Sequence, residues 1–396
     1  MMLACCLDSN KYNISIYEKN ATLGRKFLVA GKGGFNLTHS EDIAQFTERY
    51  HPKKFIEPFL NHFSNTDFRN WLKSIGIETY TGTSKRVFPI KGIKPIEVLK
   101  AIEKQLQKNQ VIINLNHEWK GWSEDELLFS NNNEVKKINS DYVVFAMGGA
   151  SWKVTGSEGN WTNYFNKIGI ETKQFYASNC AYQVNWNSLF IKTHQGQPLK
   201  NCEFSCGDFK QKGEAIITQF GIEGSGIYPL SFEIRKSLIE NKSAKIYVDF
   251  KPDLPLEELK KRLENKGKLS IKDVLEKKIN LTSTQIELLK ICSSKEEYND
   301  PGLLSKLITS YPITIVDFAP TDDAISTVGG ISLNDVTENL ELKKLPNHYC
   351  MGEMLDWDAP TGGYLLQACF SMGKFLADKL NLSLFEESRS KAGDVS

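Results

Sequence analysis

An acidic residue at the end of an apolar stretch, followed directly by a basic and glycine-rich segment, has the chemistry of a nucleotide site. The segment Asn13–Tyr17 alternates apolar and polar residues like a short strand, and Glu18 follows at its carboxyl end. A carboxylate there can accept hydrogen bonds from the two neighbouring hydroxyls of a ribose. The next residues combine positive charge with exposed backbone N–H groups, which suits phosphate: Lys19, Gly24, Arg25, Lys26, Gly31, Lys32, Gly33, Gly34 and Asn36.

Either half of this pattern has a simpler structural explanation when it is taken alone. Strands often end in Glu, and glycine-rich loops are common turn material. The two halves together offer partners for a whole dinucleotide within a few residues. We therefore favour the nucleotide site over a plain strand and turn.

The surrounding chain predicts the elements that would position these groups. Residues 41–73 have helical spacing of phenylalanines, and Pro95 opens an amphipathic helix that extends to Gln107. Residues 111–115 are predicted as a strand, and the β-branched run 141–146 is typical of a strand buried on both faces. Gly148 follows that run, where it either lets a backbone approach a ligand or makes a tight exit turn.

The domain organisation is inferred from a change in the sequence pattern at residue 177. Residues 1–176 form the first part of one domain, and short strand-like pieces followed by charged amphipathic helices predict an inserted unit over 177–311. The segment 311–317 is predicted to return the chain to the first domain, whose second part is 312–385. The polar residues 386–396 are predicted to be a flexible tail.

Composition excludes several classes of protein. With 396 residues, 40% hydrophobic residues and a formal net charge of +1, the chain is an ordinary globular protein without a general electrostatic footprint for nucleic acid or an anionic membrane. It lacks an apolar run of membrane-spanning length and a secretory signal, so we expect a cytoplasmic location and no membrane partner. The eight cysteines are scattered, and we expect reduced thiols and no metal site. Nothing in the sequence indicates an oligomeric state.

Five sequence blocks resemble a bacterial family of NAD(P)/FAD-dependent oxidoreductases that includes 3-dehydro-bile-acid reductases and aminoacetone oxidases. They follow the family's order over nearly the whole chain, and the last is the most specific. The blocks are EKNATLGRKFLVAGKGGFNLT (18–38), KRVFP (85–89), AMGGASWKVTGSEG (146–159), STVGGISL (326–333) and GEMLDWDAPTGGYLLQ (352–367).

The resemblance implies an α/β fold, in which a Rossmann-like FAD-binding domain with a three-layer, mostly parallel sheet carries an inserted β-barrel and helical domain. It places the adenosine ribose of FAD on Glu18 and favours a ligand at Gly148. One departure is the absence of the family's first strand and G-x-G-x-x-G turn, which normally hold the pyrophosphate. Residues 1–7 look like the remainder of the helix that follows that turn, so we expect a truncated chain or an internal start.

The resemblance places the isoalloxazine of FAD near the last block. Residues 348–351 are predicted as a buried strand that ends at Gly352 and Glu353, and this carboxylate can bind ribityl hydroxyls. A helix from Gly362 through Gly363 and Tyr364 would direct its first N–H groups at the flavin ring and stabilise negative charge on it. A plain strand, turn and helix is the alternative.

The implied activity is hydride transfer through flavin N5, with FAD as the cofactor and NAD(P)H as a possible reductant. We expect NAD(P)H-dependent reduction of a small keto or unsaturated substrate. The alternatives are oxygen-dependent oxidation of a small amine such as aminoacetone, reduction of uridine in rRNA, and a remnant without enzymatic activity. The candidates for proton transfer are Tyr364, His39 and His194, and none of them is assigned a catalytic role.

Overall fold

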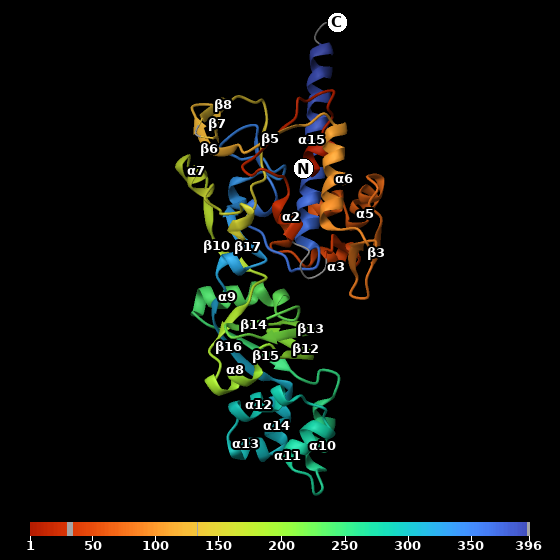
Figure 1. Cartoon of the computed structure of the whole chain (residues 1–396), viewed down its shortest axis with the longest axis vertical. Helices are drawn as coiled ribbons and strands as arrows, with labels where there is room; N and C mark the ends of the chain where they lie inside the picture. The colour runs from red at the N-terminus through yellow and green to blue at the C-terminus, as the bar shows by residue number, and fades with distance from the viewer. Residues whose placement is uncertain (30–34, 133, 394–396) are drawn as a thin grey trace. The chain divides into compact units, whose positions relative to one another are not determined.

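The computed structural model describes residues 1–29, 35–132 and 134–393. The chain forms two compact units (Figure 1). Unit 1 comprises Met1–Tyr176 and Ser326–Ser396, and unit 2 comprises Ala177–Ile325. Each unit has its own hydrophobic core. Within the described ranges no helix combines the length and the apolar character needed to span a bilayer.

Two parallel strand pairs carry the predicted nucleotide residues of unit 1. Strand β1 (Ser15–Glu18) pairs with β5 (Ile112–Leu115), with Glu18 opposite Leu115. Strand β9 (Val143–Phe145) pairs with β18 (His348–Cys350), directly before the 3-10 turn η5 (Gly352–Met354). These four strands confirm the predictions made from apolar and alternating runs. Because the pairs are parallel, the carboxyl ends of both strands in a pair lie at the same edge.

Three helices cover this part of unit 1. They are α1 (Met2–Cys6), α6 (Pro95–Lys108) and α15 (Tyr364–Gly393). In α6, Pro95 begins the helix and the Glu97 carboxylate accepts a hydrogen bond from the Lys94 backbone N–H, while Val98, Ile102 and Leu106 are buried on one face. Helix α15 packs against α1 and α4 (Lys53–His62). Because α15 continues to Gly393, the backbone of most of the predicted tail is helical.

Residues 38–89 of unit 1 fold into short helices and a three-stranded sheet. The predicted helical stretch is divided into α3 (Ile43–Thr47), α4 and α5 (Asn65–Ser74), because Asp42 and Ser64 cap new helices. The sheet has the order β2-β4-β3, and its strands are β2 (Thr38–His39), β3 (Thr79–Thr81) and β4 (Arg86–Pro89).

The other elements of unit 1 form connections around the parallel pairs. Strands β6 to β8 make a separate antiparallel sheet, and β10 pairs with β17. The bounds are α2 (Arg25–Val29), β6 (Glu118–Ser123), β7 (Glu126–Asn131), β8 (Glu134–Ile138), α7 (Thr162–Lys167), β10 (Thr172–Ser178) and β17 (Ser326–Ile331).

Unit 2 is a closed antiparallel barrel with attached helices (Figure 1). The barrel order is β11-β14-β13-β12-β15-β16, and inward side chains such as Phe204, Ile246 and Ile313 are buried. The strands are β11 (Tyr182–Val184), β12 (Pro198–Cys206), β13 (Phe209–Ile217), β14 (Gly221–Glu223), β15 (Ala244–Asp249) and β16 (Tyr311–Phe318). The helices are α8 (Ser188–His194), α9 (Ser231–Asn241), α10 (Leu256–Glu264), α11 (Ile271–Lys277), α12 (Ser283–Cys292), α13 (Lys295–Asn299) and α14 (Pro301–Thr309).

Strand β16 differs from the sequence prediction for residues 311–317. We expected this segment to lead back to the nucleotide-binding domain, but it pairs with β15 and β11 and closes the barrel. Its alternating pattern is that of a strand with one face in a core, which fits a barrel as well as a return strand. The chain re-enters unit 1 at Ser326.

The turn before α15 is packed tightly against β2. A Cβ atom on Gly363 would lie 2.5 Å from the Thr38 Cα and 2.7 Å from the Thr38 carbonyl oxygen, and Gly363 has φ +100°. The Thr38 hydroxyl also donates a hydrogen bond to Gln367 Oε1 over 2.7 Å. The start of α15 is thereby fixed to β2.

This packing predicts a large loss of stability for Gly363→Ala. We expect a cost of about 3 kcal/mol or more, from unfavourable φ and from the contact with Thr38. Gly76→Ala is the matched control, because Gly76 has φ +88° with open space around it, and it should cost only about 1 kcal/mol. Urea unfolding followed by circular dichroism measures both, and equal midpoints for the two variants would contradict the packing argument.

Candidate functional site

The carboxylate of Glu18 is held at the end of β1 by its own loop. Its Oε1 accepts hydrogen bonds from the Asn20 backbone N–H over 2.8 Å and from the Asn20 side-chain amide over 2.7 Å. The amide oxygen of Asn20 in turn accepts from Arg25 Nη1 over 2.8 Å. Among the described residues Glu18 Oε2 has no hydrogen-bond partner. The carboxylate is therefore oriented through one oxygen, and its other oxygen is not used in a contact with the described residues.

An ion pair joins the early glycine-rich segment to the end of β18. Lys26 Nζ lies 3.1 Å from Glu353 Oε2 and donates a hydrogen bond to Ser151 Oγ over 2.7 Å. The two charged side chains are 29% and 18% exposed, so water screens their attraction only in part. The sequence prediction gave Lys26 to a phosphate, whereas here its ammonium contacts a carboxylate. Glu353 Oε1 makes no hydrogen bond with the described part of the chain.

The loop after β9 lies against the loop after β1. A Cβ atom on Gly156 would be 2.6 Å from Asn20 Nδ2 and 3.1 Å from Lys19 Cε. Lys19 Nζ is 3.7 Å from Glu158 Oε1. Gly148 has φ +74°, and its carbonyl oxygen accepts a hydrogen bond from the Trp161 indole over 3.2 Å. The segments that follow three parallel strands are thus connected by direct contacts.

The predicted site residues therefore fall into three groups. Glu18, Lys19, Arg25, Lys26, Gly148, Gly352 and Glu353 belong to the connected loops after β1, β9 and β18. Gly362, Gly363 and Tyr364 lie at the start of α15, and Gly24 packs on Leu99 of α6. Asn36 is partly buried without a polar side-chain contact to the described residues, and Gly31 and Gly33 fall outside those residues.

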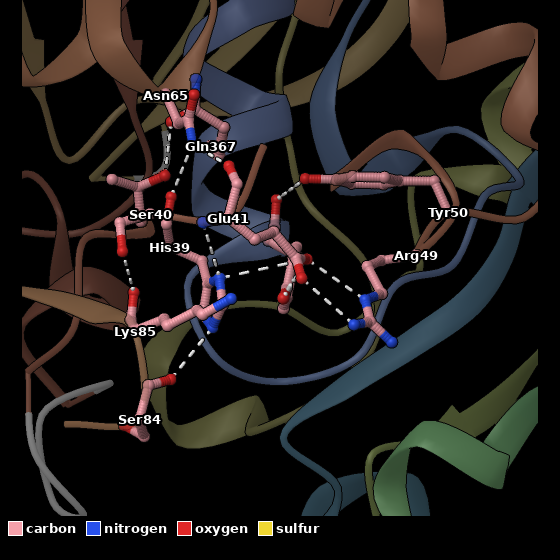
Figure 2. A network of polar contacts seen from close by, with 11 residues as sticks. His39, Ser40, Glu41, Arg49, Tyr50, Asn65, Ser84, Lys85 and Gln367 are labelled. Atoms are coloured by element: carbon pink, nitrogen blue, oxygen red, sulfur yellow. Dashed lines mark hydrogen bonds and ion pairs between the residues drawn. The ribbon is translucent and has the colours of Figure 1, made fainter. Parts of the chain in front are cut away.

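A second polar network surrounds the Glu41 carboxylate beside the start of α15 (Figure 2). Arg49 binds it with two parallel hydrogen bonds of 3.1 Å, from Nε to Oε1 and from Nη2 to Oε2. The Tyr364 hydroxyl donates to Oε1 over 2.5 Å. The Glu41 side chain is only 4% exposed. The bidentate arginine is the strongest kind of partner for a buried carboxylate.

These contacts determine the ionisation of Glu41 and Tyr364. Burial on its own would raise the pKa of Glu41, but the hydrogen bonds from Arg49 and Tyr364 outweigh burial and lower that pKa. Burial raises the pKa of Tyr364 well above its ordinary value, and the hydrogen bond to the Glu41 carboxylate raises it further. At neutral pH Glu41 is therefore a carboxylate and Tyr364 is a neutral phenol.

The hydrogen bonds of His39 define its tautomer. Its Nδ1 lies 3.2 Å from the Glu41 backbone N–H, which can only donate, so Nδ1 accepts. Its Nε2, 3.1 Å from the Ser84 carbonyl oxygen, then carries the proton and donates it there (Figure 2). Burial lowers the pKa of His39, and the charges of Arg49 and Arg86 act in the same direction. His39 is thus neutral, and it stacks on Tyr364 with ring centroids 5.2 Å apart.

The three candidates for proton transfer are consequently engaged in structural hydrogen bonds. The Tyr364 hydroxyl donates a hydrogen bond to Glu41, and both ring nitrogens of His39 have partners. His194, in unit 2, contacts the Thr284 hydroxyl over 3.0 Å and stacks on Phe190. Glu41 and Arg49 were missed by the sequence prediction. No local pattern signals them, because Glu41 and Tyr364 are 323 positions apart.

Parallel strand pairs with acidic and glycine-rich carboxyl ends, with a barrel unit inserted into the sequence of unit 1, are features of a Rossmann-like nucleotide-binding fold. Residues 1–379 match the HI0933-like protein Rossmann domain, and the chain belongs to this family. It is an FAD-dependent oxidoreductase.

Two curated proteins are similar to nearly the whole chain. The 3-dehydro-bile acid delta(4,6)-reductase of Clostridium scindens is 23% identical over 392 residues, covering 94% of this chain and 93% of the relative. The ribosomal RNA dihydrouridine synthase of Escherichia coli is 20% identical over 360 residues, covering 88% of this chain and 87% of the relative.

Solved structures of two ketosteroid dehydrogenases also align with the chain. The 3-ketosteroid-delta4-(5alpha)-dehydrogenase of Rhodococcus jostii aligns with a TM-score of 0.48 and 12% identity, over 96% of this chain and 94% of that one. The 3-ketosteroid delta1-dehydrogenase of Sterolibacterium denitrificans aligns with a TM-score of 0.49 and 11% identity, over 96% and 97%.

The Glu41 network predicts a pH-dependent loss of stability for Glu41→Gln. The variant leaves Arg49 without its counter-ion, and we expect a cost of about 2 kcal/mol at neutral pH. Because the pKa of Glu41 is lowered in the folded protein, its stabilising contribution is present above the ordinary glutamate pKa and is lost as the pH falls through the folded value. The difference between variant and wild type should therefore shrink in acid.

Glu48→Gln is the control for this prediction, because Glu48 pairs with Lys53 but its side chain is 64% exposed. It should change the free energy of unfolding by less than about 1 kcal/mol. Urea midpoints at neutral and acidic pH measure both variants. A Glu41→Gln midpoint that follows the Glu48→Gln midpoint at every pH would show that the Glu41 network contributes little.

Proposed function

We propose that the chain uses NAD(P)H to reduce a small keto or unsaturated compound through bound FAD. The cofactor assignment rests on two carboxylates that make the same kind of contact with the protein. Glu18 and Glu353 each use one oxygen in contacts with the protein, and each keeps the other oxygen without a partner among the described residues. Arg25 binds the Asn20 amide that holds Glu18, and Lys26 pairs with Glu353 directly. Both carboxylates are thus connected to adjacent residues at the start of α2.

The chemistry of this donor set fits FAD. The open oxygen of Glu18 would accept from the adenosine ribose, and that of Glu353 would accept from the ribityl chain. Arg25, Lys19 and Lys26 place positive charge in the connected loops that also carry these two carboxylates, and the phosphates of a dinucleotide require such charge. The N-terminal end of α15 would stabilise negative charge on the reduced ring. Bound FAD supplies the two-electron chemistry, and these side chains supply position and electrostatics.

The Clostridium scindens relative supports a small carbonyl substrate, because its name describes reduction of a 3-dehydro bile acid. Consumption of NAD(P)H under anaerobic conditions that depends on added 3-keto steroid tests this function. Oxygen uptake with aminoacetone and no consumption of NAD(P)H would instead favour amine oxidation. A purified chain without a flavin absorbance band after incubation with FAD would contradict the proposed function.

The Escherichia coli relative gives a second candidate, reduction of uridine in rRNA. Unit 2 carries equal numbers of basic and acidic residues, so the barrel unit as a whole has no formal charge with which to attract a polyanion. We therefore prefer the small-molecule substrate, and with it a cytoplasmic site of action. Binding of rRNA fragments at moderate salt, with formation of dihydrouridine, would reverse this preference.

Glu18→Ala should weaken FAD binding at least tenfold, because the variant loses a charged hydrogen-bond acceptor for the ribose. Glu118→Ala is the control, since Glu118 also lies on a strand of unit 1 but pairs with exposed Lys120. Titration of each apo-protein with FAD, followed by flavin fluorescence, gives the dissociation constants. Equal FAD affinity in Glu18→Ala and wild type would exclude the proposed ribose contact.

A further inference from the structure

Arg86 lies beside the start of α15, although it comes from a distant part of the chain. It begins β4 and stands directly opposite His39 of β2 in an antiparallel ladder. Residues that face each other in such a ladder project their side chains from the same face of the sheet. A Cβ atom on Gly362 would lie 3.6 Å from Arg86 Nε, and Gly362 has φ +119°. The guanidinium is therefore next to the backbone of Gly362, which carries no side chain.

The charges around Arg86 do not balance. The Glu41 carboxylate is already shared by Arg49 and the Tyr364 hydroxyl, and His39 is neutral. Within residues 1–29, 35–132 and 134–393, no carboxylate forms an ion pair with Arg86. Arg49 is therefore the guanidinium that pairs with Glu41, and Arg86 lies beside the positive end of a helix of 30 residues.

An arginine in this position is costly unless something pairs with it. Arg86 is partly buried, and a partly buried guanidinium loses hydration that a counter-ion or an acceptor has to replace. Its planar fork of N–H donors matches an oxygen with two lone pairs. Position 362, beside that fork, has no side chain that could pair with it. A negatively charged oxygen atom of a ligand would be a suitable partner for this fork.

We propose that Arg86 binds the carbonyl oxygen of the substrate beside Gly362 and stabilises the negative charge that forms on it. This inference rests on the proposed function. In the reduction of a conjugated ketone, hydride derived from NAD(P)H adds to the β-carbon and the C=C π bond breaks. Its electron pair moves through the conjugated system onto the carbonyl oxygen, giving an enolate. A proton from water then adds to the α-carbon and restores the ketone.

A phenolate resembles this enolate, so 4-nitrophenol serves as a probe that requires no turnover. Its ionised form absorbs differently from its neutral form, and the absorbance therefore reports which form is bound. We expect the wild-type protein loaded with FAD to prefer the ionised form. Arg86→Gln should weaken phenolate binding at least tenfold, and Arg86→Lys should retain part of the affinity. Lys91→Gln, an exposed change five residues further along the chain, should bind like wild type.

The outcomes separate this proposal from the proposed function. Equal phenolate affinity in wild type and Arg86→Gln, or no phenolate binding to flavin-loaded wild type, overturns the role of Arg86. Loss of FAD from Arg86→Gln with unchanged phenolate affinity also overturns it, because the guanidinium would then serve the cofactor. If wild type takes up no FAD, the proposed function fails, whereas loss of phenolate binding on Arg86→Gln would still support an oxyanion site.

Discussion

The buried carboxylate of Glu41 is the interaction on which the start of α15 depends. A carboxylate that is almost fully removed from water is stable only with strong partners, and here Arg49 and Tyr364 provide them. Tyr364 is the first residue of α15, so this contact fixes the helix to the segment after β2. The Tyr50 hydroxyl donates to the Tyr364 carbonyl oxygen over 2.7 Å and adds a second connection. The glycine turn, His39 and Arg86 take their positions from this anchor.

The segments after β1 and β18 are connected in a different way, through the short helix α2. A helix of five residues without a buried side chain cannot be held by packing alone. Its first two residues instead make polar contacts. Arg25 contacts Asn20, which orients Glu18, and Lys26 contacts Glu353. A ligand that binds both carboxylates would therefore also stabilise α2. Under the proposed function, this coupling would let two acidic strand ends that are far apart in the sequence serve one dinucleotide.

Local patterns in the sequence predicted the parallel strands and the acidic ends of β1 and β18. They succeeded because alternation and β-branched runs are properties of neighbouring residues. Strand β16 was assigned to the wrong unit, since YPITIVDF alternates in the same way whether its partner is a barrel or a parallel sheet. Glu41 and Arg49 were missed for another reason. Their importance comes from Tyr364, which only the tertiary fold brings into contact, and the placement of Gly31 and Gly33 stays a prediction.

The balance of charge gives the strongest indication of what the site selects. Unit 2 as a whole carries no formal charge, so long-range attraction of a polyanion is weak there. In unit 1, Arg86 lies beside Gly362 without a carboxylate partner among the described residues, whereas Arg49 is paired with Glu41. A single localised charge can select one oxygen atom of a ligand, but it cannot select a phosphate backbone. Selection of one carbonyl group on a small substrate, as proposed above, would require a charge localised in this way.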